Sequence, residues 1–120
     1  MDRLKNRADF LRAARTTRRS IAGLTLEMCA TPDEARKEDR IRVGFTASRK
    51  VGNAVARNRA KRRLRAAAAA VLPLHGKGGH DYVLVARTAT LARVFADLLA
   101  DLTAALKAAH GKRERMGETS

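Results

Sequence analysis

Apolar residues along the chain follow two different spacings, which predict a mixture of strands and helices. Over residues 24–28 and again over residues 41–46, apolar side chains alternate with polar ones, as in strands that bury one face. We expect these two strands to pair as an antiparallel hairpin, joined by a loop over residues 31–40. Residues 81–87 include five consecutive apolar side chains, which is typical of a central strand buried on both faces.

Helical signals occur in the segments between and around these strands. The first predicted helix covers about residues 7–15, with Asn6 placed to cap it and Asp9 in its first turn. Its apolar side consists of Phe10, Leu11 and Ala14. Asn53 is a good cap for a long second helix that runs to about Leu72, where a proline and a glycine-rich stretch follow.

The last predicted helix begins at Thr90, which can cap it, and ends before Gly111. The order helix, strand, strand, helix, strand, helix predicts a single α+β domain over residues 1–111, with helices packed on a mixed sheet. Residues 112–120 are polar, and we expect them to form a disordered tail. By default, a strand–helix–strand connection is right-handed. The apolar residues of the last helix recur at helical spacing: Leu91, Phe95, Leu98, Leu102 and Leu106.

The charge of the chain points to a polyanionic partner. There are 26 Lys and Arg residues against 12 Asp and Glu residues, so the net charge is +14. No apolar run approaches the roughly 20 residues that a membrane-spanning helix needs. The first residues lack the apolar stretch of a signal peptide, so we expect a cytoplasmic protein. The single cysteine, Cys29, excludes an intrachain disulfide and is interpreted as a small core residue.

The densest functional signal is the cationic stretch at residues 57–65 of the second helix. Successive residues of a helix advance by about 100°, so this sequence forms a thin apolar stripe beside a broad cationic face. No Asp or Glu occurs between Arg40 and His80 to compensate these cations. The stripe consists of Ala60, Leu64, Ala67 and Val71.

Two interpretations of this cationic face are open: a solvated surface, or a surface that binds a polyanion. A solvated face usually mixes charges of both signs, whereas unpaired like charges at this spacing cost a helix about tenths of a kcal/mol per pair. Guanidinium groups bind phosphate through two hydrogen bonds, and Asn58 can contact a base edge or a phosphate. We therefore favour a polyanion as the partner of this helix.

A longer segment around this helix resembles a known family. The 24-residue run Arg42–Arg65, RVGFTASRKVGNAVARNRAKRRLR, is similar to the signature of the bacterial ribonuclease P protein family. The segments Arg3–Phe10 and Asp81–Arg87 match that family as well. The resemblance implies a single-domain α-β sandwich of the ribosomal protein S5 domain 2-like type. It also implies a left-handed strand–helix–strand crossover, which differs from the default.

The resemblance implies an accessory role in a ribonucleoprotein endoribonuclease. The family's RNA subunit holds the catalytic centre and requires Mg²⁺, and the protein helps it to remove the 5′ leader from precursor tRNA. No catalytic residue, bound cofactor, metal ligand, membrane contact or protein partner is implied for this chain. The residues expected to bind the RNA subunit are Arg57, Asn58, Arg59, Lys61, Arg62 and Arg65. Those expected to line a cleft for the single-stranded leader are Phe10, Thr46, Ser48 and Lys50.

Phe10 has two possible roles. A lone phenylalanine in a short amphipathic helix is often a core residue, whereas the resemblance implies a platform on which a leader base stacks. The family usually carries a second aromatic residue one turn later, where this chain has Ala14. Stacking on the leader is therefore expected to depend on Phe10 alone, or to be weaker.

Catalysis by the chain itself finds little support in the sequence. The histidines His75, His80 and His110 are read as loop or cap residues, and no two of them have metal-ligand spacing on one element. Asp97 and Asp101 are read as the solvated face of the last helix. The alternative hypothesis to a ribonuclease P protein is a non-enzymatic basic RNA-binding protein, such as a ribosomal protein.

Overall fold

The computed structural model describes the backbone of residues 1–118 and the side chains of residues 1–111. The strands are β1 (Asp2–Arg3), β2 (Thr17–Ile21), β3 (Leu24–Ala30), β4 (Arg42–Ala47) and β5 (His80–Ala86). The α-helices are α1 (Arg7–Thr16), α2 (Ala54–His75), α3 (Thr88–Ala92) and α4 (Phe95–Glu118), and the short 3₁₀ helices are η1 (Asp33–Ala35) and η2 (Arg49–Val51).

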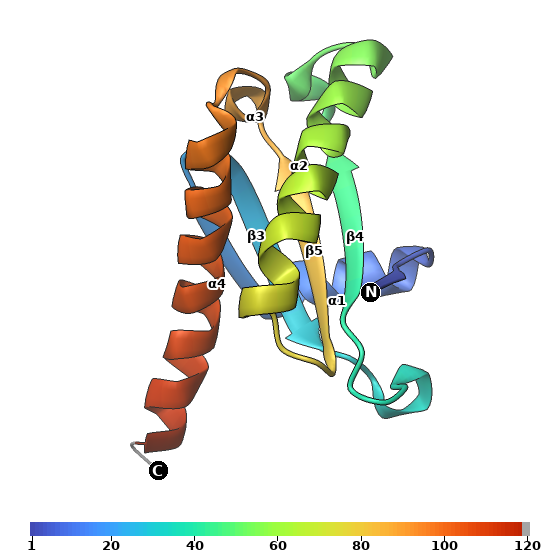
Figure 1. Cartoon of the computed structure of the whole chain (residues 1–120). Helices are drawn as coiled ribbons and strands as arrows, with labels where there is room; N and C mark the ends of the chain where they lie inside the picture. Colours follow the sequence, from blue (N-terminus) through green and yellow to red (C-terminus); the bar gives the residue numbers. More distant parts are fainter. Residues whose placement is uncertain (119–120) are drawn as a thin grey trace.

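The strands form one mixed sheet between two layers of helices. Their order is β1-β4-β5-β3-β2, with β5 parallel to β4 on one side and antiparallel to β3 on the other. This confirms the predicted central strand. Figure 1 shows α2 and α4 in front of the sheet and α1 behind it. The predicted α+β sandwich is therefore confirmed.

The connection between β4 and β5 has the less common handedness. These strands are parallel neighbours, and α2 joins them. In Figure 1 both strands point upward, α2 lies in front of them and β5 lies to the left of β4, so the crossover is left-handed. The right-handed default is wrong for this chain, and the crossover implied by the family resemblance is the one observed.

The predicted hairpin between residues 24–28 and 41–46 is also wrong. β3 and β4 run in opposite directions, but β5 lies between them. β5 is the middle strand of the sheet, so it separates the two strands that the hydrophobic pattern had paired. The polar residues of β3 do not face solvent either: Glu27 is only 6% exposed and accepts a hydrogen bond of 3.2 Å from Arg18 on β2.

The strand that does form a hairpin with β3 is β2, which the hydrophobic pattern missed. It is an edge strand in which only alternate residues are half-buried, so its sequence is mostly polar. Ala22 and Gly23 form the turn of the hairpin. A Cβ atom on Gly23 would lie 2.6 Å from Asp101 Oδ2 and 2.9 Å from Leu98 Cδ1. The glycine therefore allows α4 to pack directly on this turn.

Both α1 and α2 begin where the sequence predicts, but a side-chain cap forms only at α2. The Asn53 side chain accepts a hydrogen bond of 2.9 Å from the Ala56 amide and begins α2, as predicted. Asn6 lies at the N-cap of α1 but makes no such bond. α2 continues past Pro73 to His75, because a proline this close to the end of a helix removes only one of its backbone bonds.

The predicted last helix is two helices with a break at Arg93 and Val94. Thr90 lies inside α3, where its hydroxyl accepts from the Arg87 amide and donates to the Gly23 carbonyl at 2.6 Å. Arg63 of α2 donates to the carbonyls of Thr90 and Arg93. These bonds satisfy the carbonyls at the end of α3, and the chain then starts α4.

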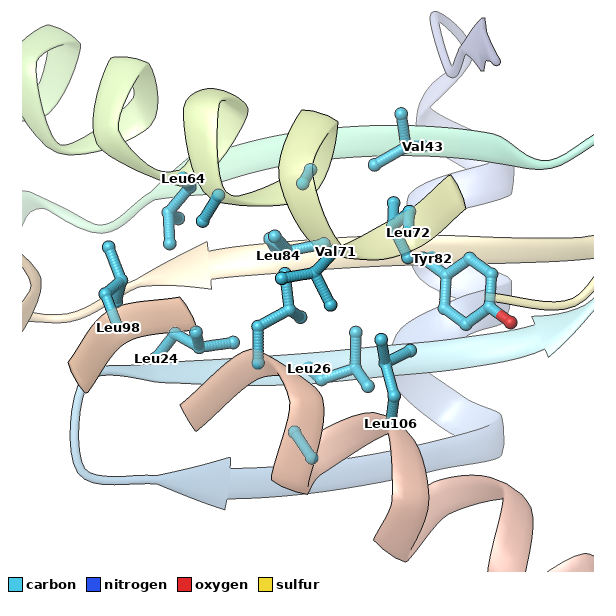
Figure 2. Packing of buried hydrophobic residues seen from close by; sticks show 14 of the residues in the cluster. Leu24, Leu26, Val43, Leu64, Val71, Leu72, Tyr82, Leu84, Leu98 and Leu106 are labelled. Atoms are coloured by element: carbon cyan, nitrogen blue, oxygen red, sulfur yellow. The ribbon is translucent and has the colours of Figure 1, made fainter. Parts of the chain in front are cut away.

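The main core lies between the sheet and the helices α2 and α4 (Figure 2). Leucine and alanine dominate it, as the low aromatic content of 3% requires. Tyr82 of β5 is its large aromatic residue and is fully buried. The residues that Figure 2 labels in this cluster are Leu24, Leu26, Val43, Leu64, Val71, Leu72, Tyr82, Leu84, Leu98 and Leu106.

The C-terminal part of α4 differs from the prediction. The helix runs through Gly111 to Glu118, and His110 lies within it instead of at its end. The His110 ring is buried, and its Nε2 atom lies 2.7 Å from the Tyr82 hydroxyl. The side chains of residues 112–118 and all of residues 119–120 lie outside the described part of the chain, so the disordered tail over 112–120 stays a prediction.

Candidate nucleic-acid interface

α2 contacts the rest of the protein along one thin stripe. Ala60, Leu64 and Ala67 are fully buried and Val71 nearly so, which confirms the apolar stripe predicted from helical spacing. Ala68 and Leu72 are buried as well. Because most of these residues are small, the helix approaches the sheet and α4 closely, and its long side chains must point elsewhere.

The outward surface of α2 over residues 57–65 is the cationic face that the sequence predicts, and we call it the basic face. Asn58, Lys61, Arg62 and Arg65 line one shallow depression of about 430 Å³, together with Val55. Arg57 is half-buried at the start of the helix, and Arg59 is exposed further round. The basic face consists of Arg57, Asn58, Arg59, Lys61, Arg62 and Arg65.

Among residues 1–111, no carboxylate forms a salt bridge with the basic face. Among the residues whose side chains are described, the observed salt bridges use arginines outside α2: Arg12, Arg18, Arg36, Arg40, Arg42 and Arg93. Arg63 is the cation of α2 that does not belong to this surface, because its guanidinium binds two backbone carbonyls at the end of α3. From the sequence, Arg63 was counted among the unpaired cations of the helix. Its carbonyl partners lie far away in the chain, so no local pattern reveals them.

Phe10 lies on the opposite side of the sheet from α2. It packs in a second, smaller cluster with Leu4, Ala13 and Val83 and is itself half-buried. Its ring rests on Gly44 of β4, where a Cβ atom would come within 2.6 Å of the ring carbons. Phe10 is therefore a packing residue that stays partly exposed, and its role as a stacking platform for a leader base remains a prediction.

The other three residues predicted for the leader continue from Phe10 along β4 and beyond it. Alternate residues of a strand share a face, so Thr46 lies on the same side of the sheet as Gly44 and Phe10. Ser48 follows the strand and Lys50 lies in η2, and both are exposed. We call these four predicted residues together the α1-side strip, after Phe10 and Thr46, which lie on the α1 side of the sheet. No residue of this strip belongs to the basic face.

A buried ionic network fixes α1 above the sheet and so places Phe10. Arg42 of β4 donates two hydrogen bonds of 2.8 Å to the fully buried Asp81 of β5. The same guanidinium lies 3.0 Å from Asp9 of α1, which also accepts from Arg12 at 2.9 Å. Thr31 donates to Asp81 at 2.7 Å. The sequence identified Asp9 only as a first-turn carboxylate and did not pair it.

Comparison with known protein families identifies the family of this chain. The family model described as Ribonuclease P matches residues 1–110. The chain belongs to the ribonuclease P protein family. Ribonuclease P is an endoribonuclease that processes the 5′ leaders of tRNA, and its catalytic RNA is the other subunit of the holoenzyme. A ribosomal protein, the alternative reading of the sequence, is not favoured.

Relatives and solved structures agree with this membership. The ribonuclease P protein component of Paramagnetospirillum magneticum is 53% identical over 108 residues, which is 89% of this chain and 81% of the relative. That of Ruegeria pomeroyi is 50% identical over 111 residues, covering 92% of this chain and 87% of the relative. The Staphylococcus aureus RNase P protein structure has a TM-score of 0.71 at 27% identity, covering 91% of this chain and 95% of that one.

Three observations concern the side chains that the sequence considers for a thiol, metal or carboxylate site. Burial and the nearby carboxylate of Asp81 raise the pKa of Cys29 to about 11, so its thiol is protonated at neutral pH. Within the described part of the chain, no three His, Cys, Asp or Glu residues gather where they could hold a metal ion. Asp101, predicted to be solvated, is instead buried and paired with Arg93 at 2.8 Å.

One further property of the fold concerns membranes. Among the described residues, no helix combines the length and the hydropathy that crossing a bilayer requires.

The network around Asp9 predicts a pH-dependent stability. Burial raises the pKa of Asp9, but the hydrogen bonds and charges of Arg12 and Arg42 outweigh it and hold the pKa below the usual 3.8. We expect Asp9→Asn to lower the free energy of unfolding at pH 7 by about 1–3 kcal/mol, because charged hydrogen bonds are lost. A depressed pKa stabilises the fold above the unfolded value, so this difference should vanish as the pH falls through the native pKa.

Urea unfolding of both proteins from pH 7 to pH 2 measures this effect. Asp33→Asn is the matched control, since Asp33 is exposed on η1. A difference between wild type and Asp9→Asn that stays constant below pH 3 would contradict the pairing described here.

Proposed function

We propose that this chain binds the RNA subunit of ribonuclease P through the basic face of α2 and binds the single-stranded 5′ leader of precursor tRNA through the α1-side strip. The observation that carries the proposal is the basic face itself, a row of cations on one rigid helix with no carboxylate partner among the described residues. A polyanion supplies the missing charge, and RNA is the polyanion that the family supplies.

Phe10 and Thr46 of the α1-side strip lie on the side of β4 opposite to the basic face, and this supports a bridging role. Side chains of β4 alternate, so one strand contacts α2 with one set of residues and carries Thr46 and the Phe10 contact at Gly44 with the other. A rigid sheet therefore holds the two RNA-binding surfaces at a fixed relative position. Such a protein aligns a leader with the RNA subunit without touching the reacting phosphate.

In this proposal, the chemistry stays in the RNA. The RNA subunit requires Mg²⁺ for cleavage, and the protein supplies charge neutralisation and orientation. Neutralising phosphates near the leader also reduces the amount of magnesium that the RNA needs to hold its substrate. The protein itself binds no cofactor in this account.

The basic face predicts a strong dependence of RNA binding on salt. If the protein neutralises 6–10 phosphates, its affinity for the RNA subunit falls by roughly three to five decades between 50 and 200 mM salt, by the estimate for duplex DNA. Arg62→Gln should weaken binding roughly three- to tenfold near 100 mM salt and reduce the slope of log K against log salt by about 0.7–0.9. Filter binding over this salt range measures both quantities.

Lys107→Gln is the control for this experiment, because it removes one exposed charge from α4. It should leave affinity and slope near the wild-type values. Binding that is flat across the salt range, or equal losses for Arg62→Gln and Lys107→Gln, would refute phosphate binding by the basic face.

Phe10 predicts a separate effect on the leader. Phe10→Leu keeps an apolar side chain over Gly44 but removes the ring on which a base stacks. We expect the reconstituted complex to lose about 1–3 kcal/mol of affinity for precursor tRNA, with little change for mature tRNA, which lacks the leader. Binding of both tRNAs, together with thermal melting of the free protein, measures the outcome.

Phe10→Ala then separates stacking from packing. It should bind precursor tRNA as weakly as Phe10→Leu while melting at a lower temperature, because the contact with Gly44 is also lost. Equal losses for precursor and mature tRNA in Phe10→Leu would remove Phe10 from the leader-binding surface.

A further inference from the structure

Phe45 of β4 lies under two arginines from distant parts of the chain. The guanidinium carbon of Arg3 is 5.0 Å from the centroid of the Phe45 ring. That of Arg65 is 5.9 Å from the same centroid. Phe45 is half-buried against the main core, so its ring is a fixed support. Both distances are within the range at which a cation is attracted to the face of an aromatic ring.

The pairing of β1 with β4 brings Arg3 close to Arg65. β1 pairs with β4 so that Arg3 stands opposite Val43, and paired residues point to the same face of a sheet. The amide of Leu4 also donates to the Val43 carbonyl at 2.9 Å, which anchors this short strand. Arg3 is thereby directed to the α2 side of the sheet, the side on which Arg65 of α2 contacts Phe45.

Within the described part of the chain, no carboxylate pairs with either of these two arginines. Both arginines are exposed, and neither takes part in a salt bridge or hydrogen bond within the described residues. The nearest carboxylate in sequence, Asp2, is bound to Arg40 at 3.0 Å. The guanidinium carbons lie 5.0 and 5.9 Å from one ring centroid, so two like charges are close together, and an anion that binds both groups reduces their repulsion. Arginine in addition matches the geometry of phosphate oxygens.

We propose that Arg3 and Arg65, supported by the ring of Phe45, form a phosphate-binding pair for the backbone of the RNA subunit. The pair extends the basic face of α2 across β4 to the edge of the sheet at β1. The inference rests on the proposed function of the basic face and adds the N-terminal strand to it. The RNA subunit is the partner, and not the leader, because Phe45 faces α2 whereas Phe10 and Thr46 lie on the other side of β4.

Direct binding of the protein to ribonuclease P RNA, without tRNA, tests this pair. Arg3→Gln should weaken binding roughly three- to tenfold near 100 mM salt and lower the salt slope by about 0.7–0.9, as expected for one lost phosphate contact. Arg3→Lys keeps the charge and should retain the slope. Because both arginines act on a shared phosphate, the loss in the double variant Arg3→Gln/Arg65→Gln should be smaller than the product of the two single losses.

Phe45→Leu tests the role of the ring. It leaves every charge in place but removes the support of both guanidinium groups, so affinity should fall while the salt slope stays at the wild-type value. Thermal melting of each variant verifies that the domain is folded, and Lys107→Gln again controls for the loss of one charge.

Any of three results would contradict the proposal that Arg3 and Arg65 form a phosphate-binding pair. Arg3→Gln could behave as Lys107→Gln does, the two single losses could simply multiply, or Arg3→Gln could weaken only the binding of precursor tRNA. The last result would assign Arg3 to the leader. These failures differ from a failure of the proposed function, in which the wild-type protein itself would not bind the RNA subunit.

Discussion

Small residues pack α2 against the sheet, and this contact determines which way the cationic side chains of the helix point. Ala60 and Ala67 are fully buried and Leu64 fills the space between them. A stripe this thin leaves most of the helix circumference outside the core. The long cationic side chains therefore gather on one outward surface, and the tight contact fixes the direction in which they point. With bulkier residues in the stripe, the helix would lie further from the sheet and that direction would change.

β4, the strand that α2 packs on, contributes side chains to both faces of the sheet. Arg42, Gly44 and Thr46 face α1, whereas Val43 and Phe45 face α2, so a single six-residue strand contributes to both. The ionic network through Arg42 sets the height of α1 above the sheet, and Gly44 leaves the room that Phe10 occupies. The uninterrupted segment that resembles the family signature thus encodes two surfaces through simple alternation.

Local signals in the sequence were sufficient for some features and misleading for others. The central strand β5, the Asn53 cap and the buried stripe of α2 follow from residues close together in the chain, and each prediction is confirmed. Pairing of β3 with β4 was wrong, because β5, which comes later in the chain, pairs with both of them, and local alternation does not reveal such long-range pairing. β2 was missed because an edge strand needs few apolar residues. Arg63 binds a carbonyl of α3, and Asp101 pairs with Arg93 at the break between α3 and α4. Hydrophobic periodicity reveals neither partner.

The central claim is that the protein orients RNA and the RNA performs the cleavage. The most direct test is the initial rate at which ribonuclease P RNA cleaves a precursor tRNA at low magnesium, with and without this protein, beside a reaction that contains the protein alone at high magnesium. The account predicts a clear acceleration by the protein at low magnesium and an intact substrate in the reaction without RNA. Specific cleavage at the mature 5′ end by RNA-free protein, or no acceleration of the RNA, would contradict it.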